Sequence, residues 1–250
     1  MFSLARIELY RLFLSPLAWV ILALCQILVA YLFLTHIDYF IQIQGKISAI
    51  PGAPGVTEMI AIPLLNNVAT ILLLIAPLIT MRLIAEERRN NSLPLLFSAP
   101  LSILQIVIGK YLGTLSFFII LLMLLSLMPL SLSLGADLDY GVIAAGLLGL
   151  ALLVASFTAI GLFLSSLTAQ PTIAAVSTFA SLFLLWIIDW AGNSAMAAET
   201  SNLFSWLSLL RHYEPLLQGD VNSSDLAYFL IVIVTFLALT IRRLDAERLN

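Results

Sequence analysis

The chain has 250 residues, of which 62% are hydrophobic and only 10% are charged, and its net charge is −3. Soluble domains carry about 45–50% apolar and about 25% charged residues, because a globule must cover its surface with polar groups. These proportions exclude an ordinary soluble domain and indicate a chain that has lipid as its solvent. The apolar runs are too long for the alternating strands of a barrel, so we expect an all-α integral membrane protein.

The N-terminal segment, residues 2–14, mixes apolar side chains with Arg6, Glu8 and Arg11. This pattern is typical of a helix that lies in the membrane interface, but the same residues could simply begin the first span. Cys25, in the apolar run that follows, is the only cysteine of the chain. A single cysteine excludes an intramolecular disulfide and gives no support for a metal site.

Six apolar segments have close to the roughly 17–25 residues that a helix needs to cross the hydrocarbon core. They are Leu17–Thr35, Pro63–Met81, Ile103–Met128, Val142–Leu167, Thr172–Ile188 and Leu226–Ile241. We expect the spans to hold no ionisable side chain. Lys110, which lies near the start of the third segment, is counted below with the basic residues of the cytoplasmic side. A secondary carrier is therefore disfavoured, because proton- or ion-coupled carriers need charges at membrane depth.

The Lys and Arg residues divide unequally between the two sides of these spans. One side has two, Lys46 and Arg211, and the other has nine. The nine are Arg6, Arg11, Arg82, Arg88, Arg89, Lys110, Arg242, Arg243 and Arg248. Because basic residues favour the cytoplasmic side, we expect both termini and the loop after the second span in the cytoplasm. Residues 36–62 are then expected to form an external loop.

The cytoplasmic loop after the second span, residues 86–102, carries a short apolar motif among charged residues. Ser92 can cap a helix whose first turn accepts Pro94. Leu93, Leu96 and Phe97 then share one face, and Pro100 ends the helix. Such a helix could dock on a partner protein, and the residues alone are equally compatible with a helix that lies on the lipid headgroups.

A second short apolar stretch precedes the last span on the expected external side. It is too short to cross, and non-spanning backbone at membrane depth is tolerated where protein or water covers it. We expect a re-entrant or interfacial helix over Leu203–Leu210, with Arg211 and Glu214 able to pair one turn apart. The residues assigned to this segment are Leu203, Phe204, Trp206, Leu207, Leu210, Arg211 and Glu214.

Groups for catalysis or nucleotide binding are scarce. The two histidines, His36 and His212, are far apart in sequence, and no Gly-rich loop ends in Lys-Ser or Lys-Thr. We therefore expect no catalytic residue, no metal site, no directly bound cofactor and no nucleic-acid partner. Gly141, Ala145 and Gly149 repeat every four positions and predict a close helix contact.

The order of these features resembles the permease subunits of type-two ABC exporters, the ABC-2 superfamily. The run Glu87-x-x-x-Asn91-Ser92-Leu93-x-Leu95-Leu96, with Ser98-Ala99-Pro100-Leu101-Ser102 after it, is similar to that family's Glu-x-x-x-Gly-Thr-x-Glu-x-Leu…Ser/Thr-x-Pro-Val-Ser segment. Residues 209–214, Gly219 and Arg242-Arg243-Leu244 resemble the gliding-motility-permease-like branch. Asn91-Ser92 replaces the usual Gly-Thr, and Pro94 replaces an acid.

The resemblance implies one permease domain over residues 1–250, with both ends inside, in the bacterial cytoplasmic (inner) membrane. The chain would not be an enzyme by itself, because ATP and Mg²⁺ would bind to a separate ABC ATPase. A second permease copy or a paralogue would complete the translocation path within membrane lipid. An alternative function is a non-transporting membrane anchor or scaffold subunit of an envelope complex.

In this family the loop after the second span holds the coupling helix that contacts the ATPase. The resemblance therefore implies that this loop transmits the ATP-driven motion to the spans. The residues that would form the contact are Glu86, Glu87, Arg88, Arg89, Ser92, Leu93, Leu96, Phe97 and Pro100.

Overall fold

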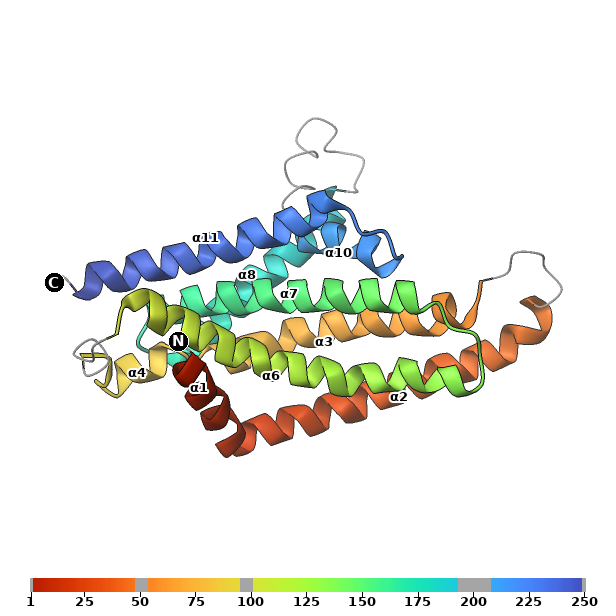
Figure 1. Cartoon of the computed structure of the whole chain (residues 1–250), viewed down its shortest axis with the longest axis horizontal. Helices are drawn as coiled ribbons and strands as arrows, with labels where there is room; N and C mark the ends of the chain where they lie inside the picture. The colour runs from red at the N-terminus through yellow and green to blue at the C-terminus, as the bar shows by residue number, and fades with distance from the viewer. Residues whose placement is uncertain (1, 48–53, 95–100, 193–207, 249–250) are drawn as a thin grey trace.

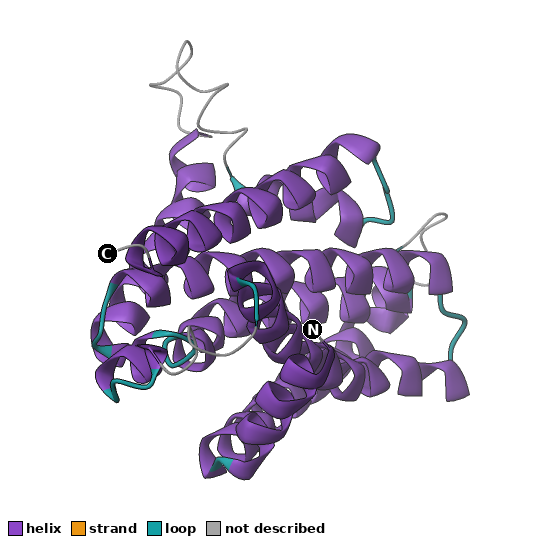
Figure 2. Ribbon diagram, turned by 60° about the vertical axis from the view of Figure 1, so that its left-hand side comes forward, coloured by secondary structure: helices purple, strands orange, loops and turns teal. Residues whose placement is uncertain are grey.

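The computed structural model describes residues 2–47, 54–94, 101–192 and 208–248. All regular structure in these ranges is helical (Figure 1, Figure 2). The all-α class expected from the sequence is confirmed.

Six helices of the described chain are long and apolar enough to cross a membrane, and each matches one of the six expected spans to within one residue or contains it. They are α2 (Pro16–Ile47), α3 (Ile62–Thr80), α6 (Ile103–Ser131), α7 (Tyr140–Leu167), α8 (Pro171–Gly192) and α11 (Ser223–Arg248). The shorter elements are α1 (Phe2–Leu14), the π turn η1 (Thr57–Ala61), α4 (Ala85–Arg89), the 3-10 turn η2 (Leu132–Leu134) and α10 (Leu209–Leu217).

Both chain termini lie at the end of the bundle that carries α4 (Figure 1). We call this the α4 end. The last turn of α2 and the first turn of α7 lie at the opposite end (Figure 1). An even number of crossings is consistent with this arrangement.

α3 and α7 form the centre of the bundle. Two thirds of the most apolar window of each helix is buried, against a third or less in the four other long helices. α7 packs against α3, α6, α8, α10 and α11. The outer helices expose large apolar side chains such as Ile27, Val176 and Val234, as expected where a protein faces lipid rather than water.

α2 continues past the expected first span. Residues 36–47, expected as the start of an external loop, are helical. Gln42 donates a hydrogen bond to Asp38 at 2.9 Å, and His36 contacts Asn67 of α3 at 3.1 Å. The loop expectation is wrong here, because polar residues that pair one turn apart support a helix outside lipid as well.

α1 is a separate helix and not the first turns of α2. It ends at Leu14. The next residue, Ser15, precedes Pro16, and helical geometry is disfavoured for a residue before proline. α1 crosses α6 at Gly109 and Gly113. A Cβ atom added at Gly113 would lie 2.8 Å from the carbonyl oxygen of Ala5, so glycine is what permits this approach. The membrane-interface position of α1 stays a prediction.

α6 places Lys110 about two turns into the third span with its side chain only 2% exposed. The expectation that the spans hold no ionisable residue is therefore wrong. A buried ammonium group is compatible with the fold only if opposite charges surround it.

α10, the described helix before the last span, overlaps the end of the expected segment Leu203–Leu210, and the re-entrant or interfacial position of that segment stays a prediction. α10 runs from Leu209 to Leu217, and the hydroxyl of Ser208 caps it by accepting a hydrogen bond from the backbone N–H of Arg211. Of the predicted segment, Leu210, Arg211 and Glu214 lie in α10. The remaining predicted positions, Leu203, Phe204, Trp206 and Leu207, lie outside the described residues.

Candidate functional site

The N-terminus of α4 is held by a side chain from the centre of the bundle. Ile84, the residue before α4, offers no capping side chain. The hydroxyl oxygen of Ser165 in α7 accepts hydrogen bonds from the backbone N–H groups of Ile84 and Ala85, each at 3.1 Å, and the same hydroxyl donates to the carbonyl of Met81 at 3.1 Å. Ser165 is fully buried. The start of α4 is therefore fixed to α7.

The C-terminus of α4 ends in a Schellman motif. Asn91 has a φ of 53°, in the left-handed region. Its N–H donates to the carbonyl of Arg88, and the N–H of Ser92 donates to the carbonyl of Glu87 at 2.9 Å. Glycine is the common residue at this position and asparagine the main substitute. Because asparagine tolerates this left-handed conformation, Asn91-Ser92 can form the same turn as the Gly-Thr pair of the family segment that the sequence resembles.

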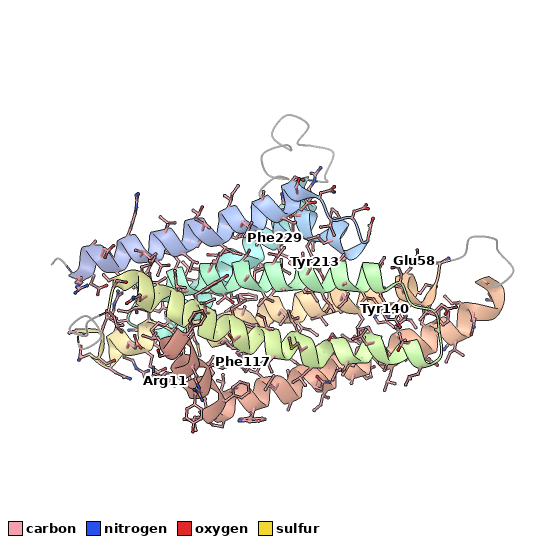
Figure 3. All side chains as sticks on the ribbon, viewed as in Figure 1. Arg11, Glu58, Phe117, Tyr140, Tyr213 and Phe229 are labelled. Carbon is pink, nitrogen blue, oxygen red and sulfur yellow. The ribbon has the colours of Figure 1, made fainter. Side chains whose placement is uncertain are left out.

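The buried face of α4 joins a charged cluster that also contains α1 and α6. Lys110 Nζ lies 2.7 Å from Glu87 Oε1 and 3.5 Å from Glu8 Oε2. Arg11, which projects from α1 at the α4 end (Figure 3), places its Nη1 3.6 Å from Glu87 Oε1. We call Glu8, Arg11, Glu87 and Lys110 the Lys110 cluster.

The Lys110 cluster balances two positive and two negative charges. Glu8, Glu87 and Lys110 are buried, so each depends on its partners, since an unpaired buried charge is costly. The Oε2 atom of Glu87 is buried without a hydrogen-bond partner in the described part of the chain. The contacts made by its Oε1 atom therefore compensate for the burial of this carboxylate.

A further ion pair connects α4 to the last span. Arg88 pairs through Nη2 with Oε2 of Glu247 in α11. α4 is thus joined to α7 through Ser165, to α1 and α6 through the Lys110 cluster, and to α11 through this pair. A displacement of α4 would be transmitted to all four helices.

The predicted coupling residues differ in their exposure. Arg89 is exposed, and Glu86, Arg88 and Ser92 are partly exposed. Glu87, by contrast, is buried inside the bundle and pairs with Lys110 in the Lys110 cluster. These exposures leave Arg89 and Glu86 as the residues of α4 that are open to a partner.

The apolar part of the predicted contact is only partly described. Leu93 is 5% exposed and packs with Leu83, Ile103 and Leu162 in a core at the α4 end. Its side chain has almost no surface left for a partner, contrary to its expected role in docking. Leu96, Phe97 and Pro100 lie outside the described residues.

α10 packs its apolar face against the N-terminal half of α7. Tyr213 and Leu216 lie against Gly149, where an added Cβ would be 3.0 Å from each. The Tyr213 hydroxyl donates to the carbonyl of Leu65 in α3 at 3.1 Å, and burial raises the pKa of Tyr213 well above its usual value. The close helix contact predicted from Gly141, Ala145 and Gly149 is therefore made, at Gly149, by a short helix.

α10 is also joined to the start of α11. His212 Nδ1 lies 2.7 Å from Asp225 Oδ1, and the His212 ring stacks on Tyr228 with centroids 4.0 Å apart. Arg211 and Glu214 lie on the exposed face of α10. Sequence reasoning missed the His212–Asp225 contact, although the acidic residue at the boundary of the last span was a signal for it.

In the described residues, no group of three or more His, Cys, Asp or Glu side chains is placed to hold a metal ion. The fold defines the class of protein, a multi-pass helical membrane protein.

The family described as ABC-2 family transporter protein matches residues 2–249. The chain therefore belongs to the ABC-2 transporter family and is a transmembrane ABC transporter permease. No curated protein matches it. The likeness to the gliding-motility-permease-like branch stays a prediction.

Proposed function

We propose that this chain is the permease subunit of an ATP-driven exporter, and that residues 86–102 couple it to a separate ABC ATPase. The observation that carries the proposal is the fixation of α4, a five-residue helix. Three sets of side-chain contacts join it to α7, to α1 and α6, and to α11. These contacts give a displacement of α4 a direct path into the spans.

The α4 end faces the cytoplasm of a bacterial inner membrane in this proposal. The nine basic residues counted on one side of the spans support this orientation, since basic residues favour the cytoplasmic side. ATP and Mg²⁺ bind to the ATPase, and a second permease copy or a paralogue completes the path. Closure of the ATPase dimer moves α4 as a rigid body, and the contacts described above transmit the motion to the spans.

The proposal is tested by purifying the tagged full chain from its native membranes and measuring ATP hydrolysis in the purified material. We expect Mg²⁺-dependent hydrolysis from a co-purifying ATPase. Phe97→Asp should reduce the recovered ATPase about tenfold or more, because an unpaired charge placed in an apolar contact costs several kcal/mol. Membrane abundance should not change, since Phe97 lies outside all six spans.

Leu134→Asp is the matched control. Leu134 is an exposed apolar residue of η2, the turn that precedes α7, and the first turn of α7 lies at the end of the bundle opposite α4. The same change there should therefore leave the ATPase bound. If the wild-type chain recovers no ATPase, the proposal is wrong. If an ATPase is recovered but its turnover is the same with and without the chain, the result favours the alternative, a non-transporting anchor or scaffold subunit.

A further inference from the structure

A cavity at the α4 end has both a charged wall and an apolar wall. Its volume is about 170 Å³, and it lies among α1, the start of α2, the end of α3 and α4. The charged wall consists of Glu8, Arg11, Arg82 and Glu86. This volume is room for several water-sized groups, enough for a small polar headgroup.

The apolar wall of the cavity belongs to the spans. Leu17 opens α2, and Leu78 lies in the last turn of α3 with 44% of its surface exposed. Both residues fall inside segments of the length and hydropathy that cross a membrane. The cavity therefore extends from the polar end of the bundle into the depth occupied by acyl chains, which a soluble partner such as an ATPase does not reach.

The corner between α1 and α2 marks the level of the lipid headgroups. Trp19 is 59% exposed, and its indole N–H donates to the carbonyl of Phe13 at 2.8 Å. Exposed tryptophans with one polar and one apolar side gather at the membrane–water interface. Ser15, at this corner, also lines the cavity, so the adjoining charged wall then lies at headgroup level.

The charges of the cavity select among headgroups. Glu8 is engaged by Lys110, whereas neither Arg82 nor Glu86 forms an ion pair with a described residue. A phosphodiester suits Arg82 and Arg11, because guanidinium groups donate charge-assisted hydrogen bonds to phosphate oxygens. A primary ammonium suits the carboxylate of Glu86. A purely anionic headgroup would be repelled by the carboxylate of Glu86. A quaternary ammonium has no N–H group to donate to this carboxylate.

We propose that this cavity binds a phospholipid whose headgroup carries both a phosphate and a primary amine, the chemistry of phosphatidylethanolamine. The phosphate lies at Arg82 and Arg11, the ammonium at Glu86, and an acyl chain follows Leu17 and Leu78. Such a lipid would join α1 to α3 and α4 beside the Lys110 cluster. The site goes beyond the proposed export function and requires no ATPase.

The test is native mass spectrometry of the full chain in detergent with added dioleoyl-phosphatidylethanolamine, -phosphatidylcholine or -phosphatidylglycerol. The ethanolamine lipid should be retained about tenfold better than either other lipid, the effect of one charge-assisted hydrogen bond. Glu86→Gln should remove this preference, and Arg82→Gln should weaken retention of all three lipids. The ratio between lipids is measured within one protein sample, so it does not depend on how much protein folds.

Arg242→Gln and Asp245→Asn are matched controls, because both residues are exposed in the last turns of α11, the helix that ends beside the C-terminus at the α4 end. They should leave the lipid preference and the retention unchanged. Equal retention of the ethanolamine and glycerol lipids, or a preference that survives Glu86→Gln, would overturn the proposal. Displacement of the lipid by millimolar inorganic phosphate would also overturn it, since that result describes a free-anion site.

Discussion

The side chain of Lys110 is almost completely buried between the carboxylates of Glu8 and Glu87. Replacing a whole buried ion pair by apolar residues is often neutral, but removing one partner costs about 3–5 kcal/mol because the other charge stays buried and unpaired. The stability of the α4 end therefore depends on the balance of this cluster more than on any one of its contacts.

Lys110→Met should lower the free energy of unfolding by about 3–5 kcal/mol, because it leaves two buried carboxylates with Arg11 alone. Unfolding of the purified chain in detergent measures the loss. Lys46→Met, at an exposed position in the last turn of α2, should change the same free energy by no more than about 0.5 kcal/mol. A triple variant with Glu8→Gln and Glu87→Gln should recover most of the loss. Equal unfolding of the Lys110 and Lys46 variants would contradict this account.

At the scale of elements, α4 is far too short to be stable by itself, since isolated helices need about 12–15 residues even to be marginal in water. Its conformation is imposed from outside, by Ser165 at its start and by the contacts of Glu87 and Arg88 along its length. Asn91 closes its end. A helix fixed in this way moves with the bundle and not as an independent loop.

Ser165→Ala should loosen α4 while the spans stay folded. The backbone N–H groups of Ile84 and Ala85 lose their acceptor, and loss of a helix cap costs about 0.5–2 kcal/mol. Amide hydrogen exchange of residues 84–89 should therefore accelerate about twofold to thirtyfold. Ser166→Ala is the control, because the hydroxyl of Ser166, equally buried, bonds to Phe163 within its own helix. If both variants exchange alike, Ser165 does not hold α4.

The short elements were the hardest to predict. Polar residues after Thr35 indicated the end of the first span, but the helix α2 continues through them to Ile47. α10 was missed as a separate helix because the length of an apolar run was weighed above the spacing of its apolar residues. Leu209, Tyr213 and Leu216, at helical intervals, carried the signal for the helix that the structure has.

At the scale of the molecule, the number of spans could be predicted because hydrophobic length is a property of each segment alone. Contacts between distant segments could not be predicted in this way. Ser165 bonds to residues 80 and 81 positions away, and no local pattern marks a serine that caps another helix. Lys110 was visible within its segment, and counting it as a loop residue concealed the cluster.

Topology is the prediction that belongs to the whole chain. Single cysteines introduced at Arg89 and Asn250 should react only after the membrane is permeabilised, and one introduced at Asp137 should react from outside in intact cells. A membrane-impermeant maleimide provides the measurement, with Cys25→Ser as the background because Cys25 is buried in α2. Labelling of position 250 from outside would contradict the six-span arrangement with both ends in the cytoplasm.

The order in which the Lys110 cluster is synthesised bears on how the third span enters the membrane. Glu8 precedes Lys110 by 102 positions and Glu87 precedes it by 23. At about 5–20 residues per second, the first carboxylate leaves the ribosome some seconds before the lysine does. Both acids are therefore synthesised before Lys110, so partners for its ammonium group are already part of the nascent chain when the third span is made. An N-terminal deletion that removes α1 would withdraw one of these partners during synthesis, and its first visible effect would be on biogenesis and not on transport.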